Sequence, residues 1–109
     1  MWLIGEITMN ESHKIVFSAL SLIEQAEIGN TGLVIENSGV SKVTDEDGHI
    51  IILMNISVKT YKNVMKASIP RIIRRWVSAK ISSITSDTFE ISCEYNENDK
   101  IYEVSIKFN

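Results

Sequence analysis

The residues best suited to bind another molecule are cations gathered in one acid-free segment. Residues 48–86 hold seven of the eleven basic residues of the chain and no acidic residue, a local charge of +7. The other 70 residues carry four basic and all fourteen acidic residues, a net charge of −10. Because charge separation of this kind concerns partners more than fold, we expect the segment to meet nucleic acid or an acidic protein surface. The alternative is a solvated helix face whose charges pair with the acidic flanks.

The second half of this segment is predicted to be helical, and a helix sorts its side chains by face. At about 100° per residue, Arg71, Arg74 and Arg75 fall opposite an apolar stripe. We therefore predict that the three arginines face solvent, where a planar guanidinium group can bond two phosphate oxygens. The stripe consists of Ile69, Ile72, Ile73, Trp76, Val77 and Ile84.

The side chains able to catalyse a reaction are few and scattered. His13 and His49 are far apart in the sequence and lack a ligand pattern, and Cys93 alternates with apolar neighbours, as a buried hydrophobe does. Residues 45–47 are acidic but fall in a turn, where carboxylates are usually solvated. No glycine-rich phosphate loop is present. The sequence therefore predicts no catalytic site, no metal site and no cofactor.

Length and composition predict one domain, residues 1–109, of ordinary globular character. The chain is 44% apolar and is long enough to bury about two-thirds of its surface around one core. The apolar run at residues 50–54 is far below the roughly 18 residues of a membrane span, and we see no secretory signal. A single cysteine excludes an internal disulfide. We expect a soluble, cytoplasmic protein.

Apolar periodicity predicts the elements of the first half of the chain. A strand over residues 2–8 is followed by a helix over residues 11–27. Residues 33–36 are ambiguous. A strand over residues 40–44 and an isoleucine-rich strand over residues 49–59 flank an Asp-Gly turn, which is typical of a hairpin.

A second helix is predicted over residues 61–84, with one internal conflict. Pro70 supplies no backbone donor, so a continuous helix would kink there at a cost of about 3 kcal/mol. Alternatively, the helix begins with Ser68 as its N-cap and carries Pro70 in its first turn. Alternating apolar residues over 88–95 and 101–108 then predict a C-terminal hairpin.

A local pattern adds a family resemblance to these expectations. The run Ile-Ile-Ile-Leu-Met-Asn-Ile at residues 50–56 precedes Met-Lys-Ala-Ser-Ile at residues 65–69 and the later Arg74. With the element order over residues 2–85, this pattern resembles the small dimerisation subunit of the KEOPS complex, the Pcc-type family of archaea and eukaryotes. There, an isoleucine-rich strand and a polar turn lead into a helix that opens Leu-Arg-Ala/Gly-Ser/Thr-hydrophobic-Asn-Ser and carries a later arginine.

Two positions of the pattern depart from the family. Pro70 replaces the asparagine and Arg71 replaces the serine, and residues 29–37 and 86–109 are additions. These departures point to a diverged paralogue that pairs with a standard small subunit. The choice between a homodimer and such a heterodimer stays open.

The resemblance implies an α+β fold, with an antiparallel sheet and two helices on one face. Its β-α-β-β-α core would span residues 2–85, and residues 86–109 would add a C-terminal hairpin. It implies a non-catalytic subunit of a complex that makes threonylcarbamoyladenosine in tRNA. The subunit would dimerise by pairing sheet edges and dock on the catalytic threonylcarbamoyltransferase subunit. The residues expected at these protein contacts are Ile52, Met54, Ile56, Met65, Ile69 and Ile73.

The acid-free helix gains a role from the same resemblance, since its cations could bind tRNA phosphates within the complex. The alternative function is a free-standing nucleic-acid-binding module. Such a module would bind RNA or DNA alone, with a steep salt dependence and with exposed aromatic residues beside its cations. The residues expected to bind RNA are Lys62, Lys66, Arg71, Arg74 and Arg75.

Overall fold

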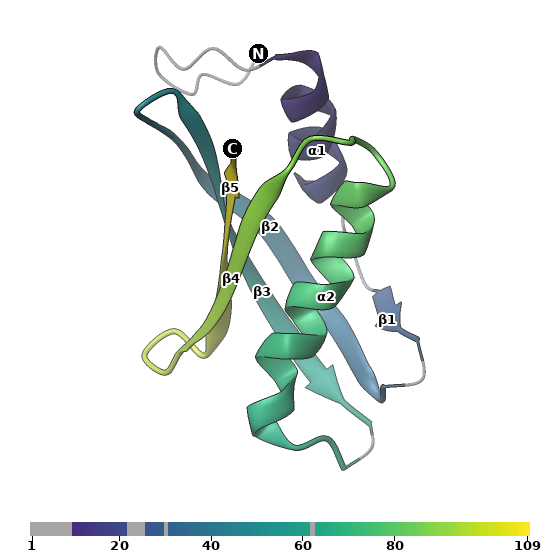
Figure 1. Cartoon of the computed structure of the whole chain (residues 1–109). Coiled ribbons are helices and arrows are strands. Elements are labelled where there is room, and N and C mark those ends of the chain that lie inside the picture. Colours follow the sequence, from purple (N-terminus) through teal and green to yellow (C-terminus); the bar gives the residue numbers. More distant parts are fainter. Residues whose placement is uncertain (1–9, 22–25, 30, 62) are drawn as a thin grey trace.

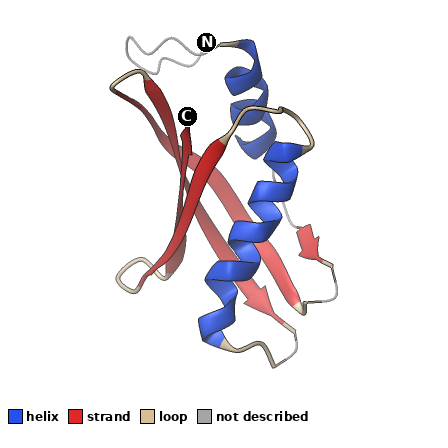
Figure 2. Cartoon of the chain, viewed as in Figure 1, coloured by secondary structure: helices blue, strands red, loops and turns tan. Residues whose placement is uncertain are grey.

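The computed structural model describes residues 10–21, 26–29, 31–61 and 63–109, which form an α+β fold (Figure 1). In this part of the chain, five strands make one antiparallel sheet in the order β1-β2-β3-β5-β4, and α1 and α2 pack on one face of it (Figure 2). The predicted α+β class, with an antiparallel sheet and two helices, is thereby confirmed, whereas the order of the elements differs from the predicted β-α-β-β-α core. The elements are α1 (Glu11–Ser21), β1 (Ala26–Ile28), β2 (Leu33–Glu46), β3 (His49–Thr60), the short 3-10 helix η1 (Lys66–Ser68), α2 (Ile69–Ser82), β4 (Phe89–Asn96) and β5 (Ile101–Phe108).

The hairpin of β2 and β3 is the longest feature of the sheet, and its turn is the one that the sequence predicts. Asp47 and Gly48 have φ angles of 54° and 84°, as the Asp-Gly turn of a tight hairpin requires. The Gly48 N–H donates a hydrogen bond of 2.9 Å to Asp45 Oδ1. The turn therefore fixes the register of the two strands.

The start of β2 is where the prediction from sequence falls short. The strand runs unbroken from Leu33, so residues 33–36 and 40–44 belong to one element rather than two. Two register shifts, which skip Glu36 and Ser41, interrupt its pairing with β3. A bulge moves the following side chains to the opposite face, so β2 lacks the simple alternation that reveals a strand.

The first helix begins as predicted and ends earlier. The Asn10 side chain accepts a hydrogen bond of 2.8 Å from the His13 N–H, so Asn10 is the N-cap. The described helix ends at Ser21, and residues 26–28 are β1 rather than helix, because they pair with the start of β2. Pairing with the sheet outweighs the helical spacing of this short segment. The strand predicted over residues 2–8 lies outside the described residues.

The second of the two predictions for α2 is confirmed. The helix begins after Ser68, with Pro70 in its first turn, and residues 61 and 63–65 are not helical. Proline is tolerated there because the first backbone N–H groups of a helix have no partner within it. Among the described residues, no helix is both long and apolar enough to span a membrane.

The C-terminal hairpin is part of the main sheet. Strand β5 pairs with β3, for example Val104 with Met54, so β3 is a central strand with neighbours on both sides. This corrects the prediction of a hairpin added to a separate β-α-β-β-α core. The inward side chains of β5 complete the apolar face of the sheet, and their pairing with β3 joins segments about 50 residues apart in sequence. The inward side chains of β5 are Tyr102, Val104, Ile106 and Phe108.

The core fills the space between the sheet and the two helices. It holds eighteen buried hydrophobic residues, and no polar or charged residue among those described is buried. Helix α2 supplies Ile69, Ile73, Val77 and Ile81, which repeat every fourth residue and form one stripe. The core is therefore purely apolar, and chemistry must be sought on the surface.

The position of Pro70 leads to a prediction. At this position of the helix a backbone N–H would have no partner, so Pro70 costs no hydrogen bond. Pro70→Asn should therefore lower the free energy of unfolding by only about 0.4–1 kcal/mol, because the unfolded chain gains conformational freedom. We expect the same variant to change affinity for a protein partner more strongly, because it alters the surface at the start of α2. Thermal melting and partner titration measure the two effects. A shift of melting temperature with no change in any partner affinity would make the proline purely structural.

Candidate functional site

The arginines of α2 form an exposed cationic face. Arg71, Arg74 and Arg75 are exposed, while Ile73 and Val77 of the same helix are buried against the sheet. The prediction that these arginines face solvent is confirmed. We call them the arginine face.

The charges of the arginine face are not neutralised by the described part of the chain. The ion pairs present there join His13 to Asp87 and Lys14 to Glu11, and none involves α2. The alternative in which the basic helix pairs with its acidic flanks therefore finds no support in the described residues. Unpaired guanidinium groups on one helix face can bind phosphate or carboxylate groups of another molecule.

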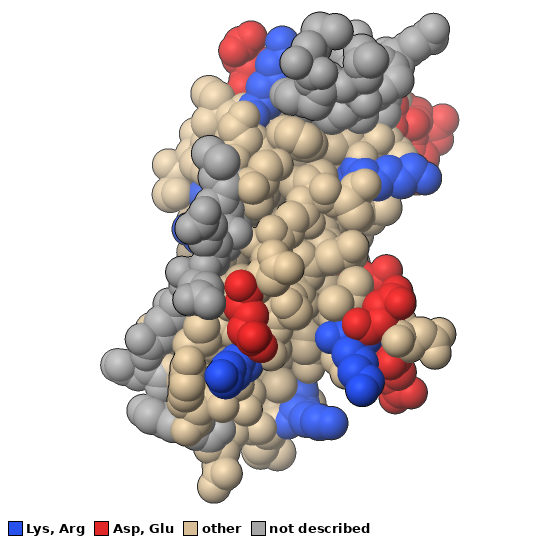
Figure 3. Space-filling view, turned by 180° about the vertical axis from the view of Figure 1, so that it is seen from behind, with Lys and Arg blue, Asp and Glu red and all other residues tan. Residues whose placement is uncertain are grey.

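The opposite side of the molecule differs in character. Seen from behind, the coloured surface has a band of uncharged residues, with charges of both signs near its margins (Figure 3). On this outer face of the sheet, Glu90 pairs directly with Lys107 across β4 and β5, which suits opposite charges. The arginine face lies on α2, on the helical side of the sheet.

Other cations of the basic segment lie against aromatic rings. Lys80 Nζ is 5.0 Å from the centre of the Trp76 ring, and Lys59 Nζ is 5.9 Å from that of Tyr61. Lys66 is exposed in η1, ahead of α2. Lys62 lies outside the described residues.

A groove borders the arginine face between α2 and β1. It has a volume of about 520 Å³, with Ile72 and Trp76 on its apolar side and two arginines at its margin. A ligand with an apolar part and an anionic group would match this combination. The lining consists of Ile28, Thr31, Arg71, Ile72, Arg75, Trp76 and Ala79.

The residues predicted for protein contacts are mostly internal. Their exposed fractions are 0% for Ile52 and Ile56, 1% for Met54, 4% for Ile69 and 0% for Ile73. These side chains hold the helices on the sheet and are not accessible to a partner of the folded chain. Met65 is the exception, since 74% of its surface is exposed.

Sheet edges are available for pairing elsewhere. In the described part of the chain the sheet ends at β4 on one side. On the other side β1 covers only residues 33–35 of β2. Strand β3 is not an edge. Among the described strands, edge pairing of a second copy would therefore use β4 or the part of β2 after residue 35.

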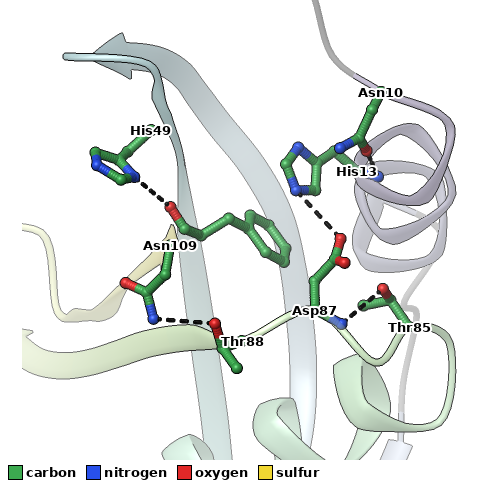
Figure 4. Close-up of polar contacts among 8 residues, drawn as sticks. Asn10, His13, His49, Thr85, Asp87, Thr88 and Asn109 are labelled. Carbon is green, nitrogen blue, oxygen red and sulfur yellow. Dashed lines mark hydrogen bonds and ion pairs between the residues drawn. The ribbon is translucent and has the colours of Figure 1, made fainter.

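Both histidines contact Phe108, His13 from α1 and His49 from the start of β3; Figure 4 shows the two histidines and their polar contacts. The His13 ring stacks on the Phe108 ring at 4.2 Å, with its Nε2 3.5 Å from Asp87 Oδ2. The His49 Nδ1 is 3.1 Å from the backbone oxygen of Phe108. Across the described residues, no three histidine, cysteine or acidic side chains gather as metal ligands would.

The environment of His13 makes stability depend on pH. Burial lowers the pKa of His13, and the nearby Asp87 carboxylate opposes this only in part. A histidine with a lowered pKa in the folded state stabilises the fold above its unfolded pKa of about 6.5, and this contribution is lost as pH falls through the folded value. We expect the melting temperature to fall on acidification below about pH 6.5, and His13→Gln to flatten that dependence. An unchanged pH profile in the variant would contradict this account.

Cys93 is unsuited to nucleophilic chemistry at neutral pH. It lies half-buried on β4, and burial raises the pKa of its thiol to about 11, against a smaller opposing effect of Arg74. A thiol with this pKa is almost fully protonated near pH 7, whereas the thiolate is the nucleophile.

One group of residues was missed by reasoning from the sequence. Tyr95 and Tyr102, opposite each other on β4 and β5, lie beside Lys66 and Lys100 in a second hollow. The alternation of the hairpin places the two tyrosines on one face. Their position beside the start of α2 depends on how the hairpin joins the sheet, which local sequence does not show.

Comparisons with known protein families, with curated proteins and with solved structures found no match.

Proposed function

We propose that this chain is a non-catalytic subunit that assembles with protein partners and supplies cations to tRNA, in the manner of the small KEOPS subunit. The observation that carries the proposal is the arginine face. Three exposed arginines without a carboxylate partner among the described residues provide a binding surface for phosphate groups. The KEOPS assignment itself rests on the sequence pattern at residues 50–56 and 65–69.

Dimerisation is the second part of the proposal. The position of β3 inside the sheet changes which strand edges could pair with a second subunit. The isoleucine-rich strand β3 is enclosed by β2 and β5, so a second small subunit would pair along β4 or along the part of β2 that no described strand covers. An exposed strand edge offers backbone donors and acceptors for this purpose. The partner would be a second copy or a paralogue.

The decisive experiment is affinity purification of the tagged full chain, with the copurified proteins identified by mass spectrometry. We expect a second small subunit and a threonylcarbamoyltransferase catalytic subunit. Sedimentation at micromolar concentration should show a dimer, either of the chain alone or with the second small subunit. A strict monomer that recovers neither protein would overturn the assembly role. If that monomer binds RNA alone, with a steep salt dependence, the chain is a free-standing nucleic-acid-binding module.

A further inference from the structure

The second hollow of the surface has features of a built binding site. It has a volume of about 460 Å³ and lies where the end of β3, the start of α2 and the β4–β5 turn come together. Figure 1 shows the start of α2 and the β4–β5 turn at the same end of the molecule. We call it the tyrosine pocket. Its principal lining residues are Thr60, Lys66, Pro70, Tyr95, Lys100 and Tyr102.

In the tyrosine pocket, a buried tyrosine ring supports an exposed one. Tyr102 is 7% exposed and belongs to the core, whereas Tyr95 is 45% exposed. Their ring centres are 4.8 Å apart, with an angle of 50° between the ring planes. The buried ring thus supports the accessible one. A supported aromatic ring loses little freedom when a planar ligand stacks on it.

The charged part of the pocket comes from two separate elements. Lys66 precedes α2 and Lys100 lies in the β4–β5 turn, and both are exposed. The lining includes one acidic residue, Glu97, which forms no ion pair with either lysine in the described chain. Both ammonium groups are therefore available to an anion, with Glu97 weakening the local positive potential in part.

We propose that the tyrosine pocket binds an unpaired nucleobase and its phosphate. An aromatic ring beside cations is the combination that binds single-stranded nucleic acid, since the base stacks while the phosphate meets the positive charge. A duplex keeps its bases stacked on each other and cannot offer one to Tyr95. The inference rests on the proposed function and adds to it: the arginine face binds phosphates of any RNA, and the pocket selects a single-stranded position.

Fluorescence anisotropy with the full chain tests this selection. The probes are a labelled single-stranded oligoribonucleotide and a blunt RNA duplex of equal length. Tyr95→Leu keeps apolar contact with Tyr102 but removes the stacking ring, so we expect about tenfold weaker binding of the single strand, with duplex binding unchanged. The matched control is Tyr61→Leu. This tyrosine is 68% exposed beside Lys59 and is not part of the pocket lining, so its loss should change binding less than about twofold.

A second measurement uses the unaltered chain, so its result does not depend on whether the Tyr95→Leu variant folds. Titration with adenosine 5′-monophosphate should shift the aromatic NMR signals of Tyr95 and Tyr102. If Tyr95→Leu binds both probes normally and those signals do not move, the pocket assignment is wrong, while loss of binding in arginine-face variants would still support the proposed function. If the signals move with an acidic peptide and not with the nucleotide, the pocket takes a carboxylate-bearing protein segment and the inference is overturned. Absence of RNA binding by both the chain and its assembled complex would instead refute the RNA role in the proposed function.

Discussion

Ile52→Asp should abolish the folded state, whereas Leu53→Asp, one residue along the same strand, should leave it intact. Ile52 is 0% exposed and lies on the face of β3 that the helices cover. The variant removes a buried aliphatic side chain, at a cost of about 2–5 kcal/mol, and adds a carboxyl group with no partner in an apolar core. The total free energy of unfolding of a domain this size is about 5–15 kcal/mol, so the loss approaches or exceeds it.

Leu53→Asp is the matched control because the same charge enters the opposite face of the sheet. Leu53 is only partly buried, and its direct cross-strand neighbours are Lys42 on β2 and Ser105 on β5. Aspartate has a low strand propensity, which costs about 1 kcal/mol or less. The attraction between an aspartate at this position and Lys42 offsets part of that cost. Circular dichroism and thermal melting distinguish the two variants. If Ile52→Asp melts cooperatively like the unaltered chain and loses only a partner, Ile52 belongs to an interface and not to the core.

The parts of the fold that the sequence predicts are those governed by local rules. The turn at Asp47-Gly48 follows from backbone geometry that few other residue pairs adopt. The start of α2 follows from Pro70 in its first turn, while the Ser68 side chain at the N-cap makes no capping hydrogen bond. The face of α2 follows from its apolar repeat. Each of these signals lies within a few residues of the feature that it determines.

The parts that the sequence does not predict depend on distant pairing. Nothing local indicates that β5 would lie beside β3, so Ile52, Met54 and Ile56 could be taken for an interface instead of a core. The bulges at Glu36 and Ser41 hide the first half of β2 for a related reason, since a bulge is visible only against the partner strand.

The candidate site divides in the same way. The arginine face is a property of one helix and is read directly from residue spacing. The tyrosine pocket joins a residue before α2 with a turn about 30 residues later, so it becomes visible only when the hairpin is placed in the sheet. The prediction from sequence groups Lys66 with the three arginines as an RNA contact and leaves Tyr95 without a role.

Replacing Arg71, Arg74 and Arg75 together by alanine should weaken tRNA binding by the assembled complex and flatten its salt dependence. Binding each phosphate releases counterions, so the slope of log affinity against log salt should fall by about 0.9 for every duplex phosphate that the variant no longer binds. The three arginines are exposed on α2 and contribute nothing to the buried stripe, so folding and assembly should persist. Anisotropy titrations between about 50 and 200 mM salt measure the effect.

The control for this experiment must remove the same charge from other parts of the surface. Lys14, Lys42 and Lys107 lie outside the basic segment, and their replacement by alanine lowers the net charge by the same three units. If tRNA binding depends on the arginine face, the lysine variant keeps most of the affinity and slope while the arginine variant loses both. Equal losses would show that only net charge matters. If the arginine variant binds tRNA normally but leaves the complex, the face is a docking surface for an acidic protein, because the guanidinium groups then pair with carboxylates rather than phosphates.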